Sequence, residues 1–215
     1  MAVGIFGSGV SALNAARIGI ATAEHNISNA NTDGYNRQQI IQSARLPQAT
    51  GAGFIGQGVD VTTVRRIYNE FLTTQVLHEQ ALASQLGSYY SQIQQIDGML
   101  ADQSAGLSAA MQDFFGAVNN VANSPESQSA RQSMLSNAEL MVSRFHALNQ
   151  RLVDMNDSIN RQITNTVTGI NSFAQQIAAL NQNIALAQAA YNGQPPNDLM
   201  DQRDYLVAQL NKQVQ

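Results

Sequence analysis

Apolar side chains recur along most of the chain at alternating steps of three and four residues. The longest run of this kind covers residues 134–191, and shorter runs cover residues 82–100 and 107–121. This spacing places the apolar side chains on one narrow face of an α-helix, as in a coiled coil. Narrow faces are buried when helices lie side by side. The pattern therefore predicts a mainly α fold, an elongated antiparallel bundle of long, coiled-coil-like helices.

Turn and cap residues indicate where these helices begin and end. We predict helices over residues 67–100, 107–121 and 125–191, and a fifth helix that starts near the cap candidates Asn197 and Asp198. Ser124 is a favourable N-cap for the longest helix, and Pro125 and Glu126 suit the turn after it. Gly193 and two prolines in "NGQPP" end that helix.

Two places weaken the helical pattern. Residues 102–106 lack apolar periodicity, and a break between two helices is predicted there. In "TNTVTGIN", residues 164–171, β-branched side chains and Gly169 lower the helix propensity. A kink at this second place, or a division into two shorter helices, is left open.

Between residues 38 and 66 the apolar period changes from that of a helix to that of a strand. The segments "QQIIQS" and "GVDVTTV" are strand-like, and Val59 and Val61 alternate with polar residues. The glycine-rich segment "LPQATGAGFIGQG" separates them. The pattern predicts a small β-hairpin element with a long connection.

The N-terminal segment carries a helical apolar face that the rest of the chain leaves without a partner. The helix is predicted to end between Asn29 and Gly34. An uncovered apolar face is a liability in a monomer, so we predict that it is an interface in an assembly. The predicted interface residues are Phe6, Val10, Leu13, Ile20 and Ile27. The predicted domains are a terminal-helix region (1–32), a turn with a β linker (33–66) and a helical rod domain (67–215).

The stretch "HNISNANTDGYNRQ" after this helix holds more cap and turn residues than a helix end requires. A Thr-Asp-Gly turn favours positive φ at Gly34. We expect Tyr35 to pack against residues 38–66 or against a neighbouring subunit. The turn is expected to lie outside the bundle. Replacement of Gly34 by valine would then misplace the terminal helix and hardly change the bundle's melting temperature.

Composition narrows the classes of function. The chain has no cysteine, a net charge of −4 and ten scattered arginines with a single lysine, Lys212. Disulfides, a cysteine metal site and a basic nucleic-acid surface are therefore excluded. The 26 glutamines and 20 asparagines fit either an amide-rich helix surface or a subunit that packs against its own copies. No apolar run reaches membrane-spanning length, and a cleaved secretory signal is not expected.

Patterns of catalytic or ligand-binding type are few. Residues 51–56, "GAGFIG", match a dinucleotide loop in glycine spacing, but a strand-like segment follows where such a loop needs a helix. The three histidines lie on different predicted helices, so their spacing does not indicate a metal site. Asp201 and Asp204 share a helix face without a base or nucleophile, and we interpret them as capping or solvated residues. We expect no catalytic, cofactor or metal site, and no enzymatic activity.

The stretch "SALNAARIGIATAEHNISNANTDGYNRQ" resembles the N-terminal signature of the bacterial flagellar axial proteins, the family of rod, hook and hook-associated subunits. An apolar helix precedes Asn-x-x-Asn-x-x-Thr-x-Gly-Tyr in that signature. The matching residues are Asn26, Asn29, Thr32, Gly34 and Tyr35, with Arg37 in the "YNRQ" that follows. The segments "GAGFIGQGVDVTTVRRIYNEFL" and "PPNDLMDQRDYLVAQL" favour a hook-associated member.

The resemblance implies a structural subunit that assembles at the junction between flagellar hook and filament. It also implies export through the flagellar type III machinery to an extracellular position. The implied partners are the hook protein, the next hook-associated protein and further copies of the chain, with no nucleic acid and no membrane insertion. Family members carry an outer domain and a C-terminal helix as well, so the chain matches an N-terminal portion. The alternatives are a hook or distal-rod subunit and, from another class, a helical sensor or adaptor bundle.

Overall fold

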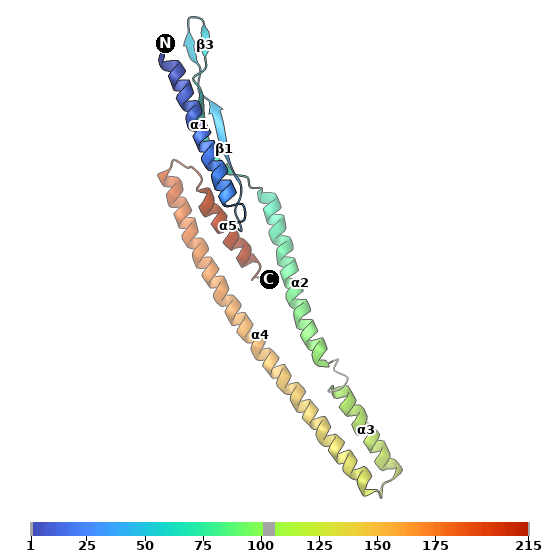
Figure 1. The fold of residues 1–215 in the computed structure, drawn as a ribbon. Coiled ribbons are helices and arrows are strands. Elements are labelled where there is room, and N and C mark those ends of the chain that lie inside the picture. Colours follow the sequence, from blue (N-terminus) through green and yellow to red (C-terminus); the bar gives the residue numbers. More distant parts are fainter. Residues whose placement is uncertain (1, 101–105, 215) are drawn as a thin grey trace. The chain divides into compact units, whose positions relative to one another are not determined.

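The computed structural model describes residues 2–100 and 106–214 and is mainly helical, with a small β element, as the sequence predicts (Figure 1). Its helices are α1 (Ala2–Ser28), α2 (Glu70–Leu100), α3 (Leu107–Asn123), α4 (Gln128–Ala190) and α5 (Asn197–Asn211). Its strands are β1 (Gln38–Ala44), β2 (Gln48–Thr50), β3 (Gly53–Ile55) and β4 (Val59–Arg66). None of these helices is long and apolar enough to cross a lipid bilayer.

The chain forms two compact units. Residues 1–81 and 169–215 make up the first unit, and residues 82–168 make up the second. The first unit therefore combines α1 and all four strands with the start of α2, the end of α4 and α5. Segments from opposite ends of the sequence come together there, whereas the second unit consists of consecutive helical segments.

The β element of the first unit is the predicted hairpin with a long connection. β1 pairs with β4 in antiparallel register, and the connection folds into a smaller hairpin of β2 and β3. The "GAGFIG" segment lies at the tip of that smaller hairpin, and strand β4 follows it. Because no helix begins after these glycines, the context that a dinucleotide loop requires is missing.

One face of α1 packs against this β element. Ser11 and Ala15 are buried, and the Ser11 hydroxyl accepts a hydrogen bond from the Val59 N–H at 3.2 Å. The Thr22 hydroxyl donates a hydrogen bond to the Ile18 carbonyl, one turn earlier in α1. Small side chains on this face let the helix approach the strands closely.

The end of α4 and α5 form an antiparallel pair in the first unit (Figure 1). The predicted stop is confirmed: Gly193 has φ +79°, and its N–H donates to the Gln188 carbonyl at 2.8 Å. This bond closes the helix end in the manner of a Schellman motif. Ile184 is buried near that end of α4. Asn211 donates from Nδ2 to the Leu77 carbonyl at 2.7 Å and so joins α5 to the start of α2.

The second unit buries small side chains and leaves the heptad face of α4 partly exposed, with Phe145 and Leu152 at 47% and 48%. Ala110 and Ala117 of α3 are buried, and Met134, Met141 and Met155 of α4 are half-buried. A four-residue connection, Ser124 to Ser127, turns the chain from α3 into α4, so the two helices run antiparallel. α4 continues unbroken through residues 164–171 and contains 63 residues, about 95 Å of helix.

Several predicted helix ends need correction. Ser124 caps the end of α3, and the N-cap of α4 is Ser127, whose hydroxyl accepts from the Ala130 N–H at 3.3 Å. α2 begins three residues late because Asn69 caps it, through a 3.1 Å bond from the Leu72 N–H. The break predicted over residues 102–106 lies outside the described residues except for Gly106.

Candidate functional site

The asparagine-rich turn after α1, residues 29–36, is held by hydrogen bonds back onto that helix. Asn29 donates from Nδ2 to the His25 carbonyl at 3.0 Å, and Thr32 donates its hydroxyl to Asn29 Oδ1 at 3.3 Å. The Tyr35 N–H donates to the Thr32 carbonyl at 3.2 Å. Gly34 has φ +80°, which confirms the positive φ predicted for this glycine.

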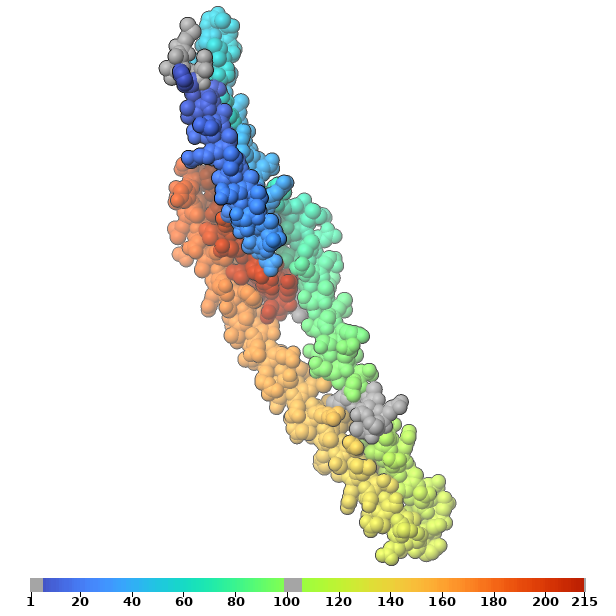
Figure 2. All heavy atoms as spheres, in the orientation of Figure 1, coloured from blue at the N-terminus to red at the C-terminus, as the bar shows by residue number. Residues whose placement is uncertain are grey.

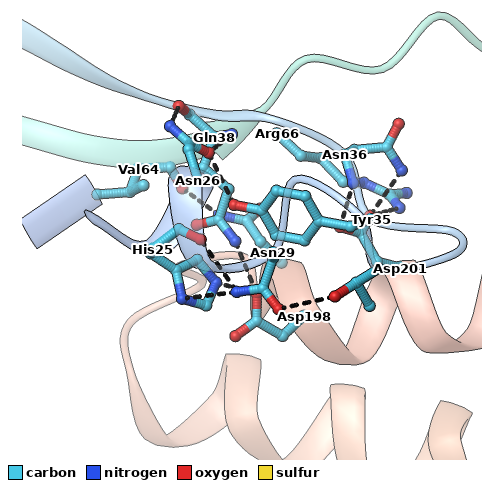
Figure 3. Close-up of polar contacts among 12 residues, drawn as sticks. His25, Asn26, Asn29, Tyr35, Asn36, Gln38, Val64, Arg66, Asp198 and Asp201 are labelled. Atoms are coloured by element: carbon cyan, nitrogen blue, oxygen red, sulfur yellow. Dashed lines mark hydrogen bonds and ion pairs between the residues drawn. The ribbon is translucent and has the colours of Figure 1, made fainter. Parts of the chain in front are cut away.

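A single amide side chain joins the end of α1 to the start of β1. Asn26 Oδ1 accepts from the Gln38 backbone N–H at 2.7 Å, and Asn26 Nδ2 donates to the Gln38 carbonyl at 2.9 Å. The amide thus pairs with Gln38 much as a neighbouring strand would. The same Oδ1 accepts the Tyr35 hydroxyl at 2.7 Å (Figure 3). These three bonds fix the direction in which the chain leaves the helix.

Tyr35 packs edge-on against His25, with ring centroids 5.5 Å apart and an interplanar angle of 71°. The structure therefore places this ring against α1, whereas one of our two expectations was packing against residues 38–66. The reason is the reversal of the chain at Gly34, which returns Tyr35 to the helix. Packing against a neighbouring subunit, the other expectation, stays a prediction. Burial raises the pKa of the Tyr35 phenol, and the negative charges of Asp198 and Asp201 raise that pKa further.

One buried carboxylate fastens the turn and β4 to α5. Asp201 is 4% exposed. Its Oδ2 accepts from the Asn36 backbone N–H, and its Oδ1 accepts from Asn36 Nδ2, each at 2.8 Å. Arg66 Nη1 donates to the same Oδ1 at 2.8 Å (Figure 3). The same nitrogen lies 2.7 Å from Asp204 Oδ2. We call Asn36, Arg66, Asp201 and Asp204 the α5 latch.

The α5 latch sets two carboxylates against one poorly solvated guanidinium. The Arg66 and Asp201 side chains are 8% and 6% exposed. Burial by itself lowers the pKa of Arg66, but hydrogen bonds to Asp201 and Asp204 outweigh that effect and raise it. The Tyr68 ring lies 4.3 Å from the guanidinium carbon, and Arg203 pairs with Asp204 at 2.8 Å. Arg66 therefore stays charged and bound.

Polar side chains at the start of α5 extend the attachment. Gln38 donates from Nε2 to Asp198 Oδ1 at 2.7 Å, and His25 Nε2 lies 3.1 Å from the same oxygen. Asn197 donates from Nδ2 to the Val64 carbonyl at 2.8 Å. Asn197 and Asp198 therefore bind other segments, and the prediction that one of them caps α5 is wrong. Pro196 occupies the N-cap position, without a side-chain cap bond.

Two further interpretations of this region are corrected by the geometry. We interpreted Asp201 and Asp204 as capping or solvated residues, but Asp201 is buried in the α5 latch. We also expected the turn to lie outside the helical bundle. Asn36 is bonded to α5, and a Cβ added to Gly34 would lie 2.7 Å from the Cβ of Tyr205 on that helix. The turn is therefore part of the packed first unit.

The apolar residues predicted as an interface are exposed along α1. Their exposed fractions are Phe6 75%, Val10 58%, Leu13 72%, Ile20 70% and Ile27 77%. They lie on the side of the helix that the β element does not cover. Arg37 is also exposed, and its backbone carbonyl accepts from the Ile67 N–H at 2.8 Å, which closes the base of the β element.

The residues that contact the turn were not predicted from the sequence. His25, Asn36, Gln38, Arg66 and Tyr205 were not predicted as site residues, and Asp201 and Asp204 were set aside. One signal was present on α5: Asn197, Asp201 and Asp204 are polar yet follow the steps of four and three that elsewhere mark buried positions. Within the described residues, no group of three or more His, Cys, Asp or Glu side chains is arranged to hold a metal ion.

Ionisation of Tyr35 gives a pH prediction for this site. Burial and the negative charges of Asp198 and Asp201 raise the pKa of its phenol, so the folded state favours the protonated form. The resulting stability is complete below the ordinary tyrosine pKa of about 10 and is lost as pH rises through the higher folded pKa. We expect the free energy of unfolding to fall less steeply with pH in this alkaline window for Tyr35→Phe than for the wild type. The free energy of unfolding is measured by urea titration at each pH; an equal fall with pH in both proteins would contradict a raised pKa for Tyr35 in the folded state.

Comparison with protein families gives a match over the helical part of the chain. Residues 93–215 match the family model described as the flagellar hook-associated protein FlgK helical domain. This match covers more than half of the chain. It includes α3, α4 and α5, and therefore the aspartates of the α5 latch, but not the turn.

Individual relatives extend the similarity to the N-terminal segment. The chain is 40% identical to flagellar hook-associated protein 1 of Salmonella typhimurium, over 95% of this chain and 37% of the relative. It is 37% identical to the protein of that name from Escherichia coli, over 98% of this chain and 38% of the relative. A Bacillus subtilis relative of the same name is 28% identical. The chain spans about two fifths of the length of these proteins.

Proposed function

Because the chain belongs to the flagellar hook-associated protein FlgK family, we propose that it acts as a structural, non-enzymatic part of the junction between flagellar hook and filament. In this proposal the terminal-helix region supplies contacts for self-assembly, the turn with its β linker connects that region to the rest, and the helical rod domain forms the body of the subunit. The division into residues 1–32, 33–66 and 67–215 is our proposed assignment of those roles.

The observation that carries the proposal is the two-sided character of α1. Ser11 and Ala15 bury one side against the β element. The opposite side leaves a row of large apolar side chains exposed over most of the helix, from Phe6 to Ile27. A soluble chain rarely exposes such a row without a partner. Burial of each large side chain against neighbouring subunits would contribute about 1.5–3 kcal/mol.

The proposed partners follow from the family. We propose that the chain contacts the hook protein on one side, the next hook-associated protein on the other, and further copies of itself around the axis. We propose an extracellular place in the flagellum, reached through the type III export machinery without a cleaved signal peptide. Neither nucleic acid nor a membrane has a part in this proposal.

A charge placed in the exposed row tests the proposal. Leu13 is 72% exposed in the single chain, so Leu13→Arg is expected to leave thermal unfolding of the purified chain unchanged. In an assembly the arginine would have to be buried unpaired, so we expect loss of hook–filament junctions and of motility. Leu13→Met is the matched control, because it keeps the position apolar at similar volume. Normal junctions with Leu13→Arg would refute the proposed interface.

A further inference from the structure

A cleft of about 560 Å³ lies between the asparagine-rich turn, α5 and the last part of α4, all within the first unit. Figure 2 shows the blue N-terminal segment lying beside red α5. The turn side contributes His25, Asp33 and Tyr35, and α5 contributes Asp198, Gln202 and Tyr205. The cleft therefore combines carboxylates, amides and two phenol rings with the apolar side chains of Leu180 and Leu206.

The charges around the cleft favour a cation. Neither arginine nor lysine lines it. Arg66 neutralises Asp201, but Asp33 has no ion pair among the described residues, and the only one at Asp198 is with His25. The negative potential is felt at Tyr35, where charges on Asp198 and Asp201 help to raise the pKa of the phenol. Carboxylates beside aromatic rings are the surroundings that a guanidinium group prefers in proteins.

We propose that this cleft receives an arginine side chain from a neighbouring copy of the chain. This proposal rests on the proposed self-assembly, and it specifies a contact between two copies: an arginine of one in the cleft of the other. Arginine is the cation that a copy can offer, because the chain has ten arginines and one lysine. Arg45, Arg66 and Arg203 are bound within the chain. Among the described residues the other seven make no ion pair: Arg17, Arg37, Arg65, Arg131, Arg144, Arg151 and Arg161.

The first experiment measures recognition by the 215-residue chain itself, without assembly. N-acetyl-arginine amide is titrated into the labelled chain while side-chain amide resonances are followed by NMR. We expect saturable shifts at Gln202 and at Asn183, a further residue of the cleft. The neutral citrulline analogue has nearly the same shape and should give no saturable shift at the same concentrations. Equal shifts with both compounds would overturn the proposal.

Variants at the rim test the charge. Asp33→Asn removes a carboxylate that makes no side-chain hydrogen bond or ion pair among the described residues, and should raise Kd for the arginine probe about two- to fivefold. Gln202→Glu adds a carboxylate and should lower Kd by a similar factor. Asp157→Asn, an exposed aspartate of α4 in the second unit, is the matched control and should leave Kd unchanged. An unchanged Kd in both cleft variants would refute the site.

A charge reversal tests whether the arginine comes from another copy. Asp33→Arg should reduce incorporation into flagella, and one of the seven arginine-to-glutamate changes should restore it in the double variant. If none restores it, the arginine belongs to another protein and the second-copy proposal fails. If the probe binds as expected but Leu13→Arg assembles normally, the proposed interface fails and the cleft chemistry stands.

Discussion

Replacing Asp201 with alanine is expected to destabilise the first unit by about 3–5 kcal/mol, the usual cost of removing one partner from a buried ion pair. Asp201 is 4% exposed and accepts three hydrogen bonds, two from Asn36 and one from Arg66. Without it, the Asn36 N–H loses its partner and Arg66 keeps only Asp204 and the ring of Tyr68. The turn should therefore separate from α5 before the helices themselves unfold.

Amide hydrogen exchange can show which of the two units loses stability. We expect Asp201→Ala to accelerate exchange in β1, β4 and α5 and to leave α3 unchanged. Asp201→Asn should be less damaging, because it retains an acceptor at Oδ1. Asp157→Ala removes an exposed helical aspartate and should change stability by less than about 0.5 kcal/mol. If Asp201→Ala matches Asp157→Ala, the α5 latch contributes nothing to stability.

Local periodicity explains why the helices were predictable from the sequence. Residues 134–191 carry a run of steps of three and four with few interruptions, and the structure forms one helix there. Because Gly169 and its β-branched neighbours lower the helix propensity, the sequence did not decide whether the helix breaks there. The helix continues through them, and Thr164 and Thr168 bond their hydroxyls to carbonyls one turn earlier, each at 2.9 Å, without interrupting it.

The contacts of the α5 latch could not be predicted from local periodicity. Asn36 and Asp201 are 165 residues apart in sequence, and Arg66 and Asp201 are 135 apart. No local spacing relates them, and a pair of aspartates on a helix resembles an ordinary solvated face. The burial of Asp201 depends on how β4 and the turn meet α5, which is a property of the tertiary fold. The cap prediction for α5 failed for the same reason, because the Asn197 side chain donates to the Val64 carbonyl of β4.

Gly34 is the position where the structure most changes an expectation, and Gly34→Val should lower the melting temperature of the first unit strongly. Two costs combine there. A β-branched residue at φ +80° is strained by at least about 1–2 kcal/mol. Its Cβ would also lie 2.7 Å from the Cβ of Tyr205, and such overpacking costs about 1–3 kcal/mol more. Tyr205→Ala would not relieve the clash, because alanine keeps that Cβ.

Two other glycines separate the strain from the clash. Gly193 has φ +79°, almost that of Gly34, with open space around its Cβ position, so Gly193→Ala measures backbone strain alone. Gly51 has neither positive φ nor a close neighbour, so Gly51→Ala should be nearly neutral. We expect Gly34→Ala to destabilise the chain more than Gly193→Ala, by the cost of pushing the turn away from α5. If thermal unfolding shows equal losses at the two positions, the turn yields without cost and is not packed on α5. A Gly34→Ala chain that melts normally yet fails to enter flagella would instead restrict the turn to assembly.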